Sequence, residues 1–98
     1  MFQIRFARGA LDDLQRLPAR DRARVVEEIQ HRLTHQPQEP DRNRKELAGL
    51  VPPWEHVKPV WELRIGDYRV FYDVDPDAQL VIVRAIRRKG RSMTKEIL

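Results

Sequence analysis

A cluster of cationic side chains stands near the C-terminal end of the sequence. The segment RAIRRKGRS, residues 84–92, has no acidic residue and five basic ones, Arg84, Arg87, Arg88, Lys89 and Arg91. The whole chain has 19 basic and 15 acidic residues, so the charge is concentrated locally. Phosphates attract Lys and Arg whatever the base sequence. The cluster therefore predicts a polyanionic partner, either a nucleic acid or an acidic protein segment, and does not decide between them.

Arg69 stands apart from this cluster, within the otherwise apolar segment DYRVFYDV, residues 67–74. A long cation in such a setting needs a partner or a ligand. One interpretation is an ion pair with Glu62 on the neighbouring predicted strand. The other is a phosphate bound on the sheet, and the sequence alone favours neither.

Histidines offer two further possibilities for chemistry. His31 and His35 have the one-turn spacing of a helical metal pair, but no acidic third ligand is evident, so we predict exposed helix histidines and no metal site. His56 precedes the predicted sheet, and its ordinary pKa lies close to neutrality. It is a candidate proton shuttle, with a simple loop residue as the alternative.

Length and composition limit the class of protein. With 98 residues, of which 41% are hydrophobic and 35% charged, the chain is expected to form one domain spanning residues 1–98. No apolar run approaches membrane-spanning length, and no secretion signal is evident. The absence of cysteine excludes a disulfide framework and a thiolate metal site, so a cytoplasmic location is expected.

Apolar periodicity predicts the secondary structure of the N-terminal half. Residues 2–7 alternate as a strand with one buried face. Leucines at helical spacing predict a helix over 10–17, which Pro18 ends, and an apolar stripe predicts a longer helix over about 19–35. The two helices should form a hairpin. Residues 36–45 contain two prolines and no apolar side chain, which predicts an exposed loop.

Strand patterning returns in the C-terminal half. Segments 60–65 and 68–74 alternate in hydrophobicity, and Gly66-Asp67 between them predicts a tight hairpin turn. Residues 75–79 predict another turn, and 80–86 predict a strand covered on both faces. The predicted fold is α+β, with an N-terminal strand, a helical hairpin and a three-stranded antiparallel meander in a small sheet, helices on one face, and a short C-terminal tail or helix.

The other face of this sheet is expected to be open. Alternation directs to it the side chains of Val60, Glu62, Arg64, Arg69 and Phe71, and His56 and Lys58 can extend the row. Cations beside an aromatic ring suit single-stranded RNA, whose bases can stack on the ring. For each residue alone, ordinary solvated charge is the simpler interpretation, and the clustering favours RNA.

Over nearly its whole length the chain resembles the RelE/ParE superfamily of bacterial type II toxins. The resemblance is carried by KELAGL at 45–50, by WELRIGDYRVFY at 61–72, and by the closing strand with its basic end. Order and length also agree with the family, whose members place a helical hairpin against a small, mainly antiparallel sheet.

The resemblance implies a toxin encoded with an antitoxin that wraps it and blocks its working face. RelE-like members cut messenger RNA in the ribosomal A site without a metal: the ribose 2′-hydroxyl attacks the adjacent phosphate, and basic residues stabilise the added charge. The implied catalytic residues are Arg69, supported by Arg64 and Lys89, with His56 as the proton shuttle. The residues expected to hold RNA are Lys58, Phe71, Arg87, Arg88 and Arg91, and no cofactor is expected.

Two regions depart from the RelE ribonuclease pattern. Val60 and Glu62 hold places where these ribonucleases often carry lysines, and Ser92 and Thr94 stand where some members have a tyrosine. ParE-branch members share the fold and poison DNA gyrase without cleaving a bond. The match at 61–72 and the basic tail nevertheless predict a ribosome-dependent messenger RNA endoribonuclease. The alternatives are a gyrase inhibitor, or a weakly active member whose basic face mainly binds its antitoxin; no membrane partner is expected.

Overall fold

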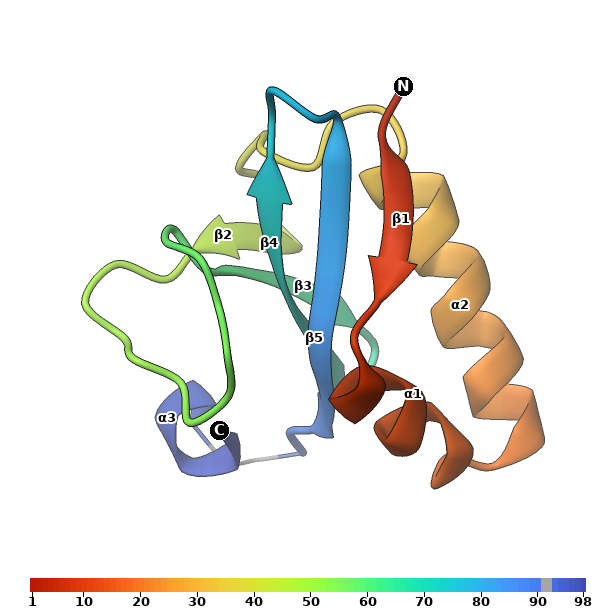
Figure 1. The fold of residues 1–98 in the computed structure, drawn as a ribbon. Helices are drawn as coiled ribbons and strands as arrows, with labels where there is room; N and C mark the ends of the chain where they lie inside the picture. Colours follow the sequence, from red (N-terminus) through yellow and green to blue (C-terminus); the bar gives the residue numbers. More distant parts are fainter. Residues whose placement is uncertain (91–92) are drawn as a thin grey trace.

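The computed structural model describes residues 1–90 and 93–98, which form one mixed sheet with helices beside it. In chain order the elements are β1 (Gln3–Phe6), α1 (Arg8–Gln15), α2 (Ala19–Leu33), β2 (Arg44–Glu46), β3 (Trp61–Ile65), β4 (Tyr68–Asp75), β5 (Leu80–Arg88) and α3 (Thr94–Ile97). The strand order is β1-β5-β4-β3-β2. Only the pairing of β1 with β5 is parallel (Figure 1).

The predicted α+β class, helical hairpin and antiparallel meander are confirmed. Gly66 makes the hairpin turn between β3 and β4 with φ of 57°, a left-handed conformation that glycine adopts without strain. The prediction of a loop over 36–45 is wrong at its end, because β2 begins at Arg44 and pairs antiparallel with β3. A strand of 3 residues is too short to show an alternating pattern in the sequence.

One arginine holds the helical hairpin together. Pro18 separates α1 from α2, as predicted, and the carbonyl groups at the end of α1 lack partners within that helix. Arg22 of α2 donates through Nε to the Leu14 carbonyl at 3.1 Å and through Nη2 to the Leu17 carbonyl at 3.2 Å. A cation at the C-terminal end of a helix also interacts favourably with the helix dipole. Arg22 therefore fixes the turn of the hairpin.

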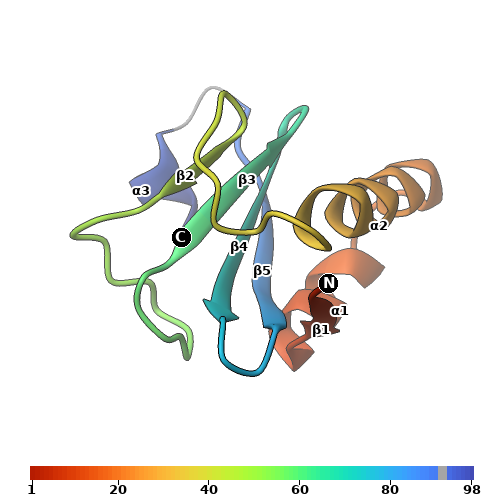
Figure 2. The same cartoon turned by 90° about the horizontal axis from the view of Figure 1, so that it is seen from above.

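The main hydrophobic core lies between the sheet and the helices α1 and α2, which cover one face (Figure 2). The strand residues predicted to face the helices all belong to it: Trp61, Leu63, Ile65, Tyr68, Val70, Tyr72 and Val74. Ala10 and Leu14 of α1 and Val25, Ile29 and Leu33 of α2 complete the contact. None of the helices within residues 1–90 and 93–98 is long and apolar enough to cross a membrane.

The prediction of an open second face is wrong for most of that face. Leu47, Val60, Phe71 and Ala85 form a second buried cluster, against which Leu50, Trp54, Ile97 and Leu98 pack. Residues 47–60 and α3 therefore lie on the side of the sheet away from α1 and α2, as Figures 1 and 2 show. Alternation makes Val60 and Phe71 face outward from the main core, and these apolar side chains require a cover of their own. A pocket lined by Glu62, Arg64 and Arg69 remains on this face near the β3–β4 turn.

Candidate anion-binding site

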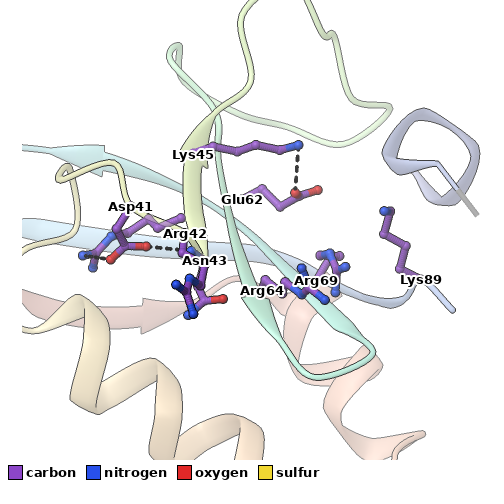
Figure 3. Close-up of a pocket in the computed structure, with 9 residues that line it drawn as sticks. Asp41, Arg42, Asn43, Lys45, Glu62, Arg64, Arg69 and Lys89 are labelled. Atoms are coloured by element: carbon purple, nitrogen blue, oxygen red, sulfur yellow. Dashed lines mark hydrogen bonds and ion pairs between the residues drawn. The ribbon is translucent and has the colours of Figure 1, made fainter. Parts of the chain in front are cut away.

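A pocket of about 150 Å³ lies where β2, β3, β4 and the end of β5 meet. We call it the anion pocket. Figure 3 shows that its side chains come from distant parts of the chain. The lining residues are Asp41, Arg42, Asn43, Arg44, Lys45, Glu62, Arg64, Arg69 and Lys89.

The anion pocket is strongly cationic. Six of its nine lining residues are basic and two are acidic. Each acidic residue already has a basic neighbour: Asp41 lies 2.9 Å from Arg44, and Glu62 lies 3.7 Å from Lys45. In the part of the chain that the structure describes, the remaining four cations have no carboxylate partner: Arg42, Arg64, Arg69 and Lys89. Such a group can be neutralised by an anionic ligand.

Arg69 is the most buried of these four cations, with 7% of its surface exposed. Its Nη1 atom donates to the carbonyl oxygens of Gly66 at 3.0 Å and Tyr68 at 2.9 Å. A guanidinium has five N–H donors, and those on Nε and Nη2 of Arg69 have no partner among the described residues. The predicted alternative of an Arg69–Glu62 ion pair is wrong, because Glu62 pairs with Lys45.

The electrostatic setting of Arg69 favours an anion. Burial lowers the pKa of Arg69 below its ordinary value, Glu62 acts in the opposite direction, and Arg64 lowers this pKa further. The lowered pKa means that the surroundings disfavour the charged form relative to water. Arginine nevertheless stays protonated in proteins. A bound anion would therefore compensate a charge that the protein compensates incompletely.

Register places Arg64 and Lys89 beside Arg69. Arg64 of β3 lies directly opposite Arg69 of β4, and its side chain is exposed. Lys89 follows β5, and its backbone N–H donates to the Asp67 carbonyl at 2.7 Å, which ties it to the β3–β4 turn. The structure thus brings together Arg64, Arg69 and Lys89, three of the four predicted catalytic residues.

The loop before β2 contributes residues that the sequence did not single out. Arg44 is buried and donates to the carbonyls of Glu39 at 2.6 Å and Arg32 at 2.8 Å, besides its contact with Asp41. These bonds fasten the loop to the end of α2. The backbone N–H of Arg64 donates to the Asn43 carbonyl at 2.6 Å, so Arg42 and Asn43 are held at the pocket.

Glu62 is buried in the anion pocket, as Arg44 and Arg69 are, with 4% of its surface exposed. Its Oε2 accepts a hydrogen bond of 2.7 Å from the Thr94 hydroxyl, which links α3 to β3. The family resemblance suggested a lysine at position 62 and a tyrosine near position 94. This chain instead places a carboxylate and a hydroxyl together, and that pairing could not be inferred from their separation in sequence.

Phe71 cannot stack on a base as predicted. Its ring is fully buried in the second cluster, with its centroid 5.3 Å from that of Trp54. The ring faces away from the helices, as the alternation indicated, but the segment 47–60 covers it. The sequence signal that was available is the apolar content of that segment, since Leu47, Leu50 and Trp54 also need burial.

Arg87 and Arg88 also lie outside the anion pocket. Arg87 Nη1 donates to Asp13 Oδ2 at 2.6 Å, and its guanidinium lies 5.3 Å from the Trp54 ring centre, so it links α1 to the second cluster. Arg88 lies opposite Tyr68 in the β4–β5 pairing and therefore faces the helices, away from Arg69. For these two residues, internal contact and sheet register prevent the predicted shared RNA surface.

The remaining predicted residues are not assembled with Arg69 either. Nδ1 of His56 lies 2.9 Å from the Trp54 carbonyl, and the adjacent Val57 N–H donates to Asp73. Asp73 is four residues beyond Arg69 on β4, about 13 Å along the strand, so His56 lies at the far end of this face. Lys58 is exposed beside a different pocket, with Leu47 and Val60. Arg91 lies outside the described residues.

The chain matches a known protein family. The model of a protein family described as the ParE toxin of a type II toxin-antitoxin system, parDE, matches residues 4–93. No curated protein matches the chain.

Among solved structures, the chain is similar to the RelBE2 toxin-antitoxin complex of Mycobacterium tuberculosis, with 28% identity, 87% of this chain and 94% of that chain covered, and a TM-score of 0.68. The archaeal RelE-RelB complex of Pyrococcus horikoshii gives 22% identity, coverage of 93% and 98%, and a TM-score of 0.70. The isolated RelE toxin of E. coli gives 17% identity, coverage of 98% and 93%, and a TM-score of 0.71. The last two likenesses show a shared fold.

Proposed function

We propose that this chain, which belongs to the family of ParE toxins of type II toxin-antitoxin systems, inhibits translation by cleaving messenger RNA on the ribosome. The observation that carries this proposal is the convergence of Arg64, Arg69 and Lys89 on one pocket, without carboxylate partners among the described residues. A cognate antitoxin is the expected protein partner, since the similar M. tuberculosis and P. horikoshii structures are toxin-antitoxin complexes.

The chemistry that suits this pocket is attack of a ribose 2′-oxygen on the adjacent phosphorus. The P–O5′ bond breaks, a cyclic phosphate forms, and negative charge accumulates on the equatorial oxygens. Fixed cations stabilise this charge more than the charge of the ground state, and that difference accelerates the reaction. Arg69 is the central cation, because its buried guanidinium is already fixed by the turn. Arg64 and Lys89 supply additional charge at its sides.

Proton transfer falls to Glu62 and Lys89 in this proposal, in place of His56. Glu62 lines the same pocket as Arg69, and its carboxylate can accept the proton of the 2′-hydroxyl. Thr94 orients that carboxylate through a hydrogen bond of 2.7 Å. The Lys89 ammonium can donate a proton to the leaving 5′-oxygen, which departs as a hydroxyl.

The test is primer extension on a defined message in a cell-free translation system, with and without the purified protein. New 3′ ends that require ribosomes support cleavage. We expect Arg64→Ala and Lys89→Ala to reduce cleavage while keeping the fold, since neither side chain makes a hydrogen bond within residues 1–90 and 93–98. Arg69→Ala should reduce it about 10²-fold or more, but it also removes two bonds to the turn, so its fold is checked by circular dichroism. Arg5→Ala, on the exposed side of β1, is the matched control.

Inhibition of DNA gyrase is the second candidate. It is favoured by the match to the ParE family model. It is also favoured by Val60, because RelE ribonucleases often carry a lysine at this position, whereas Val60 is buried in the second cluster. The same experiment separates the two candidates. An intact message, combined with loss of supercoiling by purified gyrase, supports the gyrase inhibitor, whereas ribosome-dependent cleavage with normal supercoiling supports the ribonuclease.

A further inference from the structure

A second cationic pocket adjoins the anion pocket. It has a volume of about 180 Å³ and lies between α2 and the β3–β4 turn. Arg64 and Asn43 line both pockets, so the two pockets adjoin at these residues. We call the second pocket the arginine groove; its other lining residues are Arg24, Glu28, Arg32, Ile65 and Gly66.

Two arginines of the arginine groove have no carboxylate partner among the residues that the structure describes. Glu28 is engaged by Arg32, with 2.9 Å between the carboxylate and Nε. Arg24 and Arg64 therefore remain as two positive charges facing one concave surface. Single cations on a flat surface are solvated by water. Two cations that line one concave pocket without a carboxylate partner concentrate the positive potential there.

The geometry of the turn explains how Arg24 reaches this position. Its Nη1 and Nη2 atoms lie 3.2 and 3.3 Å from the position that a Cβ of residue 66 would occupy. A Cβ at position 66 would crowd the Arg24 guanidinium, and the φ of 57° at this position independently favours glycine. The carbonyl of the same Gly66 accepts a hydrogen bond of 3.0 Å from Arg69. One turn thus holds Arg24 on the side of the groove and Arg69 on the side of the anion pocket.

We propose that the arginine groove is a second phosphate subsite, which binds the backbone phosphate next to the one held in the anion pocket. A nucleic acid strand presents phosphates at regular intervals, and two adjoining pockets that share Arg64 suit two consecutive phosphates. Arginine is well matched to phosphate, because its planar fork can donate two parallel hydrogen bonds. This inference deepens the proposed function and rests on it for the identity of the strand as RNA.

The experiment measures binding apart from cleavage. Single-stranded 2′-deoxyoligonucleotides lack the attacking hydroxyl, so fluorescence anisotropy can compare a dinucleotide, which has one internucleotide phosphate, with longer oligomers. The variants are Arg24→Ala and Arg24→Gln, with Arg5→Ala as the matched charge control. Arg24 and Arg5 are both exposed, and thermal unfolding of each variant checks that the fold is kept.

We expect Arg24→Ala to weaken binding of the longer oligomers by about five- to tenfold and to leave dinucleotide binding unchanged. The slope of log affinity against log salt should fall by about 0.7, the value for one phosphate contact on a single strand. If Arg24→Ala binds the longer oligomers with the same affinity and the same salt slope as Arg5→Ala, the proposal is overturned.

A second anion distinguishes RNA from an acidic protein segment. Hexaglutamate is titrated against the same variants. If Arg24→Ala weakens hexaglutamate binding and leaves oligonucleotide binding unchanged, the groove is an acidic-peptide site and the phosphate proposal fails. Failure of the proposed function would be recognised separately, as an intact message in the translation assay, because anisotropy requires no cleavage.

Discussion

Arg64 and Arg69 form a directly opposed cross-strand pair of like charges on β3 and β4. Like charges in this position destabilise a sheet. Arg87 continues the same row on β5, but Asp13 compensates its charge at 2.6 Å. Among the described residues neither Arg64 nor Arg69 forms an ion pair with a carboxylate, which is the physical basis for expecting an anion at this position.

Replacing one member of this pair should stabilise the protein. We expect Arg64→Thr to raise the free energy of unfolding by up to about 1 kcal/mol, because it removes the opposed charge and suits a strand. Inorganic phosphate should raise the unfolding midpoint of the unmodified protein more than that of the variant. Thermal unfolding at several phosphate concentrations measures both effects. Equal stabilisation by phosphate would place its binding elsewhere.

Glu62→Gln should separate binding from catalysis. The substitution keeps an oxygen to accept the Thr94 hydrogen bond and removes a negative charge from the anion pocket. RNA should therefore bind as tightly as before or more tightly, while cleavage falls by about 10²-fold or more through loss of the general base. Anisotropy and primer extension provide the two readouts. Undiminished cleavage would reduce Glu62 to a structural partner of α3.

Phe71→Leu should leave RNA binding unchanged. A stacked base would contribute about 1–3 kcal/mol and would be lost with the ring, but Phe71 is fully buried beneath the segment 47–60. Phe71→Ala should cost about 3–5 kcal/mol of stability because it leaves a cavity. Chemical unfolding measures the stability of both variants, and anisotropy measures the RNA affinity of the leucine variant. A large loss of affinity in a stable leucine variant would restore the stacking role.

Tyr72→Phe should change how stability depends on alkaline pH. Burial raises the pKa of Tyr72 well above its ordinary value of 10.0, and its hydroxyl donates to the Pro37 carbonyl. Above about pH 10 the unfolded tyrosine ionises while the folded one stays neutral, so the folded state loses stability as pH rises. The variant lacks this loss, but leaving the Pro37 carbonyl without its donor costs about 1–3 kcal/mol at neutral pH.

The measurement for Tyr72 is urea unfolding by circular dichroism at about pH 8 and about pH 11. The stability difference between the two proteins should narrow at the higher pH. The pKa of Tyr68 is also raised, chiefly by its hydrogen bond to Asp21. Because Tyr68 is present in both proteins, its contribution cancels in the difference between their free energies of unfolding. A constant difference would show that Tyr72 ionises equally in both states.

The elements that the sequence predicted are those whose signals are local. Alternation over 60–65 and 68–74, the turn at Gly66 and the break at Pro18 depend on neighbouring residues, and the structure has strands at 61–65 and 68–75, this turn and this break. The strand at Arg44–Glu46 was missed because its pairing with β3, far along the chain, creates it. The cover over Phe71 was missed for the same reason, since residues 47–60 and α3 pack there without a periodic pattern.

By itself the sequence determined the fold class, the faces of β3 and β4 that pack on the helices, and Arg69 as a cation in need of a partner. The tertiary structure decided which charged side chains are neighbours. Strand register places Arg64 opposite Arg69 and directs the Arg88 side chain to the other face, while Arg87 forms an ion pair with Asp13. The physical reason is that hydrophobic periodicity specifies a direction for each side chain, whereas electrostatic neighbours depend on strand pairing and on packing between segments distant in sequence.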